Sequence, residues 1–398
     1  MLQWQNGRFH NGKGHWFRVT NTAQTHISLF RPYLDEREVQ AVSEVLRSGW
    51  LGQGPRTEEF ENQFTAYTGA AHTVAVNSCT SALSIAMQLL GVGPGDEVIV
   101  PALTFVATAH AVAFHGARPV FCDIDPETLN LDIEDAASRI TPRTRAVLPV
   151  HYGGRPVALD RLRSRIGPDL PVIEDAAHAC GAQYQGRRIG GHGNIACFSF
   201  QAVKNLTAGD GGAVTFPGGR DHDMDRARVL RWLGINRDTW DRTKLPTRLW
   251  WQYEVDAVTL KYQMNDIAAA MALVQLDKLP SMNARRKAVA LRYTDGFRDN
   301  PRIKTPLQDS DDSASSWHIY ALEVDRRDDL HLYLKEQRID SGVHYKPVHM
   351  YGIYGTDVRL PAAEAAYPRL LSLPMHPGLS DDDVDRVIHA VNTFTAHT

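Results

Sequence analysis

The sequence predicts an α/β protein in which a mostly parallel sheet is flanked by helices and followed by a smaller C-terminal α/β domain. Between residues 81 and 216, stretches with helical periodicity alternate with short apolar stretches of strand length. Strands separated by helices form βαβ units, which build parallel sheets with helices on both faces. The chain has 398 residues, of which 43% are hydrophobic, so it is long enough for a large core and two domains.

The elements of the larger domain follow from this alternation. An amphipathic helix is expected over residues 36–46, where valines and Leu46 recur at helical spacing and Gly49 ends the run. A short strand through Val74 then turns into the next helix. The remaining elements are expected in this order: helix 81–90, strand 97–101, helix 107–114, strand 118–123, helix 131–139, strand 145–150, helix 158–165, and strands near 171–174, 195–200 and 212–216.

The C-terminal third predicts a second, smaller core. A helix over 264–278 closes the larger domain, and Pro280 separates it from a more polar helix. Beyond Pro280 we expect helix 282–298, strand 317–324, helix 327–337, a short strand 341–344 and a last helix 381–394. The predicted organisation is therefore an N-terminal extension over 1–28, a large domain over 29–280 and a small domain over 281–398.

Composition excludes several classes of partner. The formal net charge is −3 and the sequence pI about 6.6, so no positive field would attract a nucleic acid. No run of eighteen apolar residues exists that would cross a membrane, and the polar start lacks a secretory signal, so we expect a cytoplasmic protein. The four cysteines are too widely spaced for a disulfide framework or a zinc site, and we expect small buried side chains at Cys79, Cys122, Cys180 and Cys197.

Chemistry is expected at the carboxyl ends of the strands, where ligands bind in sheets of this kind. The strand through Val74 leads to Asn77-Ser-Cys-Thr-Ser, a helix start whose unpaired N–H groups suit a phosphate, with hydroxyls from Thr80 and Ser81 as further donors. A merely capped helix is the alternative. Asp175 ends another apolar strand and either faces the ligand or caps the next turn.

Two further strand ends carry a lysine and an aromatic ring. Most lysines are solvated surface groups. Lys204, however, follows a strongly apolar strand and precedes a glycine-rich turn, a place where a lysine with a lowered pKa could attack a carbonyl group. Phe105 either belongs to the core or stacks on a planar ring. Together, the phosphate-suited helix start, the aromatic, the carboxylate and the lysine match pyridoxal 5′-phosphate (PLP), which has an aldehyde, a pyridine nitrogen, a flat ring and a phosphate.

A series of motifs in fixed order also carries a family resemblance. The motifs are Leu46-Arg-Ser-Gly-Trp-Leu-Gly-Gln-Gly-Pro, Phe60-Glu-Asn-Gln-Phe, Asn77-Ser-Cys-Thr-Ser-Ala-Leu, Pro101-Ala-Leu-Thr-Phe-Val-Ala-Thr, Glu174-Asp-Ala-Ala-His, Ser199-Phe-Gln-Ala-Val-Lys-Asn, Gly211-Gly-Ala-Val, Tyr262-Gln-Met-Asn-Asp-Ile-Ala-Ala, Val343-His-Tyr-Lys-Pro-Val-His and Leu373-Pro-Met-His-Pro. From about Leu29 to its end, the chain resembles the DegT/DnrJ/EryC1/StrS family of sugar aminotransferases, which are PLP enzymes of fold type I.

The resemblance implies roles for the cofactor-facing residues. Lys204 is similar to the lysine that bonds to the cofactor aldehyde and moves the proton between substrate and cofactor. Asp175 is similar to the carboxylate that pairs with the pyridine nitrogen, and His178 to the residue that bonds the ring hydroxyl. Gln201 lies near the cofactor in such enzymes.

The remaining cofactor contacts include two departures from the family pattern. The backbone of Cys79 and Thr80, together with Ser199, resembles the family's phosphate site, and Phe105 its ring-stacking aromatic. Position 79 is usually glycine, but cysteine still offers its backbone N–H. Lys261 stands where the family has the asparagine that reaches the phosphate in the neighbouring subunit, so a homodimer with shared active sites is implied.

The implied reaction transfers an amino group from glutamate or glutamine to a keto sugar, expected to be a nucleotide-linked 3- or 4-keto sugar. Candidates for substrate contact are Trp50, His344, Tyr345 and His349, each of which has a purely structural alternative. Three alternative interpretations are a cyclitol aminotransferase, a PLP-dependent sugar dehydratase and a non-catalytic PLP-binding protein. The dehydratases of this family carry histidine in place of Lys204, and the absence of a Gly-x-Gly-x-x-Gly motif after the first strand argues against a nicotinamide enzyme.

Overall fold

The computed structural model describes residues 25–244, 249 and 251–396, and within the first 24 residues the three short strands β1 (Gln3–Gln5), β2 (Arg8–His10) and β3 (Trp16–Arg18). Among the described residues, no helix is both long and apolar enough to cross a membrane. All four cysteines are buried and unpaired, as the sequence predicts.

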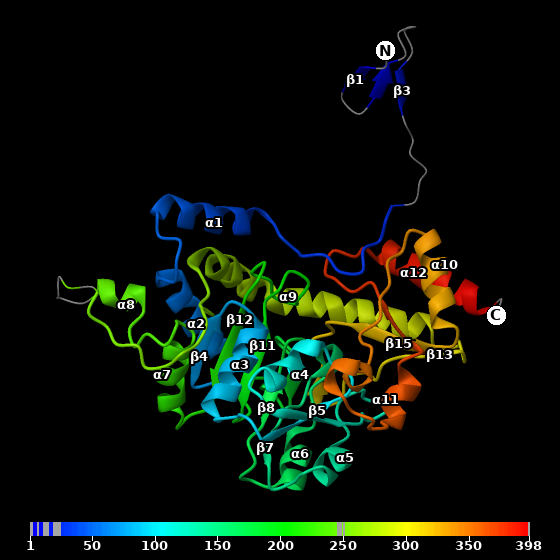
Figure 1. Cartoon of the computed structure of the whole chain (residues 1–398). Coiled ribbons are helices and arrows are strands. Elements are labelled where there is room, and N and C mark those ends of the chain that lie inside the picture. Colours follow the sequence, from blue (N-terminus) through cyan, green and yellow to red (C-terminus); the bar gives the residue numbers. More distant parts are fainter. Residues whose placement is uncertain are drawn as a thin grey trace.

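A mixed sheet of mainly parallel strands forms the centre of the large domain (Figure 1). Strand β12 runs antiparallel to both of its neighbours, whereas the other neighbouring strands run parallel to one another. Two isolated bridges, Val147 to Val172 and Val150 to Asp175, join β7 to β8. The spatial order is β4 (His72–Val76), β12 (Gly212–Phe216), β11 (Ile195–Ser199), β8 (Ile173–Asp175), β7 (Thr144–Val147), β5 (Glu97–Pro101) and β6 (Arg118–Cys122).

Helices cover both faces of this sheet, and alternate strand residues pack against each layer. In β11, Ile195 and Cys197 belong to one core cluster, whereas Ala196 and Phe198 belong to the other, as the two-residue period of a strand requires. The first cluster includes side chains of α3 (Cys79–Leu89), α4 (Val106–Ala113) and α7 (Asp221–Leu230). The second includes side chains of α2 (Pro55–Thr68), α5 (Ile133–Ser138), α6 (Leu159–Ile166) and the first half of α9 (Asp266–Gly296).

The small domain has its own sheet and core. Its antiparallel sheet has the order β13 (Ile303–Lys304), β15 (Tyr320–Val324) and β16 (Leu370–Leu373). Its core includes residues of α10 (Arg327–Glu336), α12 (Asp381–Ala396) and the second half of α9. The shorter elements are β9 (Gln183–Tyr184), β10 (Arg187–Arg188), β14 (Ser313–Ala314), α8 (Thr239–Thr243), α11 (Pro361–Ala366) and the 3₁₀ turns Tyr152–Gly154, Val348–Met350 and Gly352–Tyr354.

The expected helix break at Pro280 is wrong, because α9 continues through this proline (Figure 1). A proline inside a helix removes one backbone hydrogen bond and costs about 3 kcal/mol. Tertiary contacts on both sides offset this cost: the Lys278 ammonium lies 2.7 Å from Glu38, and the Asn283 amide donates to the Cys180 carbonyl. One helix therefore serves both cores, and the expected domain boundary after residue 280 falls inside it.

The expected strand over 341–344 and the expected end of the N-terminal extension differ from the structure. Residues 341–344 form no strand, since only the single bridge between Gly342 and Ser372 is present. The extension expected outside the fold is shorter at its C-terminal end, because Ile27 is buried in the small-domain core and pairs with Ile339. The predicted first helix is confirmed as α1 (Glu36–Ser48), which Asp35 and Glu38 cap in a capping box and Gly49 terminates at a φ of 75°.

Candidate active site

A cavity of about 440 Å³ lies at the carboxyl ends of β8 and β11, beside the start of α3. Its size falls within the roughly 300–1,000 Å³ typical of ligand pockets. Most of the predicted site residues share this cavity, although they come from segments far apart in the sequence. The predicted residues that line it are Cys79, Thr80, Phe105, Asp175, His178, Ser199, Gln201, Lys204, His344 and Tyr345.

Lys204 lies in the turn that follows β11, where its backbone N–H donates to the Gln201 carbonyl at 2.9 Å. Burial lowers the pKa of Lys204 to about 8, and the neighbouring Asp175 carboxylate opposes this shift. A lysine with this pKa is partly neutral near pH 7, whereas a solvated lysine is almost entirely charged. Lys204 therefore provides a nucleophilic amine inside the cavity.

Asp175 is the last residue of β8, and its carboxylate is almost fully buried. Burial raises the pKa of Asp175, while hydrogen bonds from the Ala177 backbone and Thr108 oppose this change. The Thr108 hydroxyl donates to Oδ2 at 2.8 Å, and the Ala177 N–H donates to Oδ1 at 3.1 Å. Asp175 thus satisfies both interpretations of the sequence, since it caps the next turn and also lines the cavity.

His178 is held as a neutral imidazole of defined orientation. Burial, with a contribution from Lys204, keeps the pKa of His178 well below its usual value. Its Nδ1 accepts the Gly153 backbone N–H at 3.3 Å, so the single ring proton belongs on Nε2. Nε2 lies 3.1 Å from the Tyr345 hydroxyl oxygen and donates to it. The histidine ring is therefore held at the wall of the cavity by Gly153 on one side and by Tyr345 on the other.

The first turn of α3 leaves backbone donors for an anion. Ser78 caps the helix by accepting the Ser81 N–H at 3.1 Å, and the Ser81 hydroxyl donates to Asn77 at 2.6 Å. Ser81 is consequently occupied within the cap and does not line the cavity. In the described part of the chain, no hydrogen bond engages the backbone N–H groups of Cys79 and Thr80. Such free donors at a helix start form an anion site.

Gly212 allows β12 to pass close to this helix start. A Cβ atom at position 212 would lie 2.5 Å from the Ser78 carbonyl carbon and 2.7 Å from the Cys79 nitrogen. Both neighbours are backbone atoms, so neither can move without displacing the anion site. The glycine of the Gly211-Gly-Ala-Val motif is therefore required by close approach.

Thr108 also lines the cavity, although its sequence context did not single it out. It lies one helical turn beyond Phe105 on α4, and Thr104 lies on the same side, with its hydroxyl 2.7 Å from that of Thr108. Helical spacing from Phe105 was the available signal for this position.

Trp50 and Lys261 do not line the cavity of this chain. The Trp50 indole N–H donates to the Gln53 carbonyl at 3.0 Å, and its ring meets Trp240 edge to face. The Lys261 ammonium lies 5.2 Å above the ring of Trp232. Trp50 and Lys261 therefore contact aromatic and polar residues outside the cavity, among them Trp240 and Trp232 in the chain segment that precedes α9.

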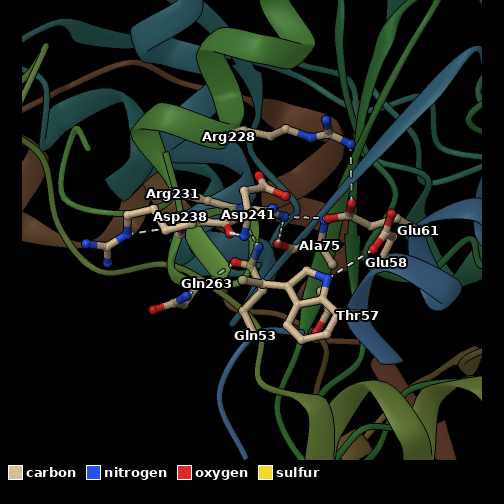
Figure 2. Close-up of polar contacts among 12 residues, drawn as sticks. Gln53, Thr57, Glu58, Glu61, Ala75, Arg228, Arg231, Asp238, Asp241 and Gln263 are labelled. Atoms are coloured by element: carbon tan, nitrogen blue, oxygen red, sulfur yellow. Dashed lines mark hydrogen bonds and ion pairs between the residues drawn. The ribbon is translucent and has the colours of Figure 1, made fainter. Parts of the chain in front are cut away.

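A polar network fixes this neighbouring region, as Figure 2 shows. The Gln53 amide donates to Asp238 at 2.5 Å and accepts from Gln263 at 3.2 Å, joining the loop after Trp50 to the segment before α9. In the same network, the buried Arg231 guanidinium pairs with Glu61 and lies 3.5 Å from Asp238. The loop is thus tied to α2 and the segment that leads into α8.

His349 also lies outside the cavity, buried beside Glu364 at 3.5 Å. His344 does line the cavity, and burial together with Lys204 lowers the pKa of His344 to about 4. Its Nδ1 lies 2.9 Å from the Ser372 hydroxyl, and its backbone carbonyl accepts a hydrogen bond from Tyr152. The small domain therefore contributes His344 and Tyr345, but not His349, to the cavity.

Comparison with known proteins identifies the family. The family model described as the DegT/DnrJ/EryC1/StrS aminotransferase family matches residues 32–392. The chain belongs to this aminotransferase family. The earlier resemblance is thereby confirmed, and with it the expected fold class and an aminotransferase activity.

Individual relatives agree over nearly the whole chain. The spore coat polysaccharide biosynthesis protein SpsC of Bacillus subtilis is 42% identical over 374 residues, which cover 90% of this chain and 95% of SpsC. The crystal structure of the aminotransferase TlmJ from Streptoalloteichus hindustanus superposes with a TM-score of 0.88 at 39% identity, covering 94% of this chain and all of TlmJ. The Streptococcus pneumoniae protein Spr1654, solved in apo, pyridoxamine 5′-phosphate (PMP) and PLP forms, is 32% identical to this chain. The match to its PLP form has a TM-score of 0.86 and covers 94% of this chain and 99% of Spr1654.

Proposed function

We propose that the cavity binds PLP and that the chain transfers an amino group from glutamate or glutamine to a keto sugar. The observation that carries this proposal is one cavity that contains the amine of Lys204, the buried carboxylate of Asp175 and the free N–H groups at the start of α3. These groups fit an aldehyde, a pyridine nitrogen and a phosphate. The PLP and PMP forms of Spr1654 support the same cofactor.

Each remaining part of the cofactor has a matching group in the cavity. In this proposal, the N–H groups of Cys79 and Thr80, with Ser199, hold the phosphate. Phe105 and Gln201 both line the cavity, where Phe105 would stack on one ring face and Gln201 would lie beside the cofactor. When bound, PLP supplies a ring that withdraws electrons from the substrate carbon that loses a proton.

Asp175 acts by keeping the ring nitrogen protonated. An ion pair at about 4 Å with an effective dielectric constant of about 20 is worth roughly 4 kcal/mol, or about three pKa units. Such a shift keeps a pyridine nitrogen charged at neutral pH. The hydrogen bonds from Thr108 and Ala177 stabilise the ionised carboxylate, which burial would otherwise disfavour.

In this proposal, Lys204 transfers the proton and His178 holds the cofactor ring. Lys204, with its pKa lowered to about 8, takes a proton from the substrate carbon and returns one at neutral pH. The imidazole of His178 and the hydroxyl of Tyr345, which share a hydrogen bond at the cavity wall, would hold the ring hydroxyl of the cofactor. His344 and Tyr345 contact the sugar, and we keep Trp50 and His349 as candidates for substrate contact in the assembled enzyme.

The sugar substrate is inferred from the names of relatives. SpsC is named for polysaccharide biosynthesis, and PseC of Helicobacter pylori, which is 29% identical with a TM-score of 0.85, is an aminotransferase of pseudoaminic acid biosynthesis. We propose a nucleotide-linked 3- or 4-keto sugar as the acceptor, and a cyclitol ketone as the alternative. An assay with each class of ketone and with glutamate or glutamine as the donor, followed by mass spectrometry of the product, separates them. Failure of every ketone to gain an amine would contradict the proposal.

A cytoplasmic homodimer with shared active sites completes the proposal. Val39 and Leu46 on α1 are 56% and 54% exposed although they belong to its apolar face, and Val255, Val258 and Leu260 are also exposed. Such apolar surface suits a second copy of the chain. Mixing the Lys204→Ala and Lys261→Ala variants tests sharing, because each hybrid dimer would then contain one site with both lysines intact. No recovery of activity in the mixture, with both parents inactive, would contradict a contribution of Lys261 across the interface.

A further inference from the structure

Three consecutive buried residues of the small domain contact the loops that carry the active-site side chains. Ser316, Trp317 and His318 precede β15, and none of them is more than 3% exposed. None of them lines the cavity. They nevertheless touch the loops that follow β7, β8 and β11, and we call them the small-domain clamp.

The clamp binds the loop after β7 through its backbone. The Ser316 N–H donates to the Gly154 carbonyl at 3.1 Å, and the His318 N–H donates to the Gly153 carbonyl at 2.9 Å. Gly153 in turn donates its N–H to Nδ1 of His178, the bond that sets the position of the His178 ring proton. The clamp therefore fixes the donor that orients His178.

The clamp also contacts His178 directly. The Ser316 hydroxyl donates to the His178 carbonyl at 2.6 Å, and the rings of His178 and His318 lie 4.5 Å apart at 39°. Phe30 stacks on His318 as well, with the rings 5.5 Å apart and nearly parallel. A Cβ at position 154 would lie 2.3 Å from the Ser316 hydroxyl oxygen and 3.0 Å from the His178 carbonyl oxygen, so this packing requires a glycine there.

The third contact is to Asn205, the residue next to Lys204. The Asn205 amide nitrogen donates to the Ser316 carbonyl at 2.7 Å and to Asn283 on α9 at 2.8 Å. Its oxygen lies 3.0 Å from Nδ1 of His318. Because the Asn205 nitrogen is assigned by its two acceptors, its oxygen must accept, and Nδ1 of His318 therefore carries the proton.

We propose that His318 is a positioning residue, which holds Lys204 through Asn205 and holds His178 through ring contact and the Gly153 loop. This inference rests on the proposed function, since both positioned residues act there on the cofactor. Displacement of a reacting group by about 1 Å costs on the order of 100-fold in rate. A side chain that touches neither cofactor nor substrate thus controls the rate by setting where Lys204 and His178 lie.

Three substitutions separate the hydrogen bond from the ring. His318→Asn places an amide N–H near the position of Nδ1 but loses the ring contacts. His318→Gln carries the same amide one methylene further out, so it is the matched control that misses the Asn205 oxygen. His318→Phe keeps a ring between His178 and Phe30 but removes the donor.

The readouts are the rate of PLP capture by the apoprotein, the pH midpoint of the bound cofactor's visible absorbance, kcat, KM and the Tm of the apoprotein. We expect His318→Phe and His318→Gln to lower kcat by about 10- to 100-fold with KM changed less than about threefold. Their absorbance midpoints should shift, while His318→Asn retains more of the rate and of the wild-type midpoint. Rates and midpoints equal to wild type in all three variants would overturn the proposal.

The same experiment distinguishes the inference from the function on which it rests. A wild-type protein that captures no PLP refutes the proposed function itself, whereas an active wild type with equally active variants refutes only the role of His318. Rate losses that follow Tm alone, with unshifted midpoints, would assign His318 to stability. Failure of all three variants to fold would lead to the same conclusion, and either result overturns the positioning role.

Discussion

The titration of Lys204 in the apoprotein tests the physical basis of the active site. Burial lowers the pKa of Lys204 to about 8, against about 10.4 for a solvated lysine. At pH 7, these values correspond to a neutral fraction of about 9% and about 0.04%, respectively, a difference of about 200-fold. Because only the neutral amine attacks a carbonyl, the cavity raises the fraction of this lysine that is able to react at neutral pH by roughly that factor.

The assay is competitive amine modification of the apoprotein at a series of pH values, with the extent of labelling at Lys204 measured by peptide mass spectrometry. Exposed Lys335 serves as the internal reference for reagent loss. The midpoint for Lys204 should lie near pH 8. Asp175→Asn should move it lower still, because the carboxylate raises the pKa of Lys204. A midpoint near 10.4, or an upward shift in the Asp175 variant, would refute the account of the site.

Three further predictions concern single residues. Asp175→Asn should keep the fold and lose most turnover, and steady-state kinetics showing unchanged kcat would remove Asp175 from the mechanism. Gly212→Ala should weaken phosphate binding and cost about 1–3 kcal/mol of stability from overpacking, which PLP titration and thermal unfolding measure; wild-type values would contradict the close approach. Arg231→Met should cost about 3–5 kcal/mol, because it leaves the Glu61 carboxylate buried without its main partner, whereas the exposed control Arg228→Met should cost less than about 1 kcal/mol in the same urea unfolding measurement. Equal costs for the two arginines would refute the assignment of the buried pair.

Local periodicity predicted those elements whose packing agrees with their own sequence pattern. The helices and strands that we expected between residues 81 and 216 lie within a few residues of their expected positions, because alternating apolar residues face one of the two helix layers, whereas the short strands β9 and β10 were not expected. The break at Pro280 was wrong because contacts from α1 and the loop after β8 stabilise α9 on both sides of the proline. Such contacts come from residues distant in sequence, which a local pattern does not contain.

The same distinction applies to the candidate site. Lys204 and Asp175 were predictable because each is an exceptional residue at the end of an apolar strand. His318 and Asn205 were not, since 113 positions separate them and neither shows a pattern of its own. Trp50, Lys261 and His349 were predicted from motifs, but a motif does not tell whether a residue lies at its own cavity or elsewhere.

Chemical trapping of the cofactor tests the central claim most directly. The purified protein, supplied with PLP and reduced with borohydride, should carry one phosphopyridoxyl group, and peptide mass spectrometry should locate it on Lys204. The Lys204→Ala variant, treated in the same way, should gain no adduct. An adduct at another lysine, or none in a folded wild-type protein, would contradict the assignment of this cavity as the active site.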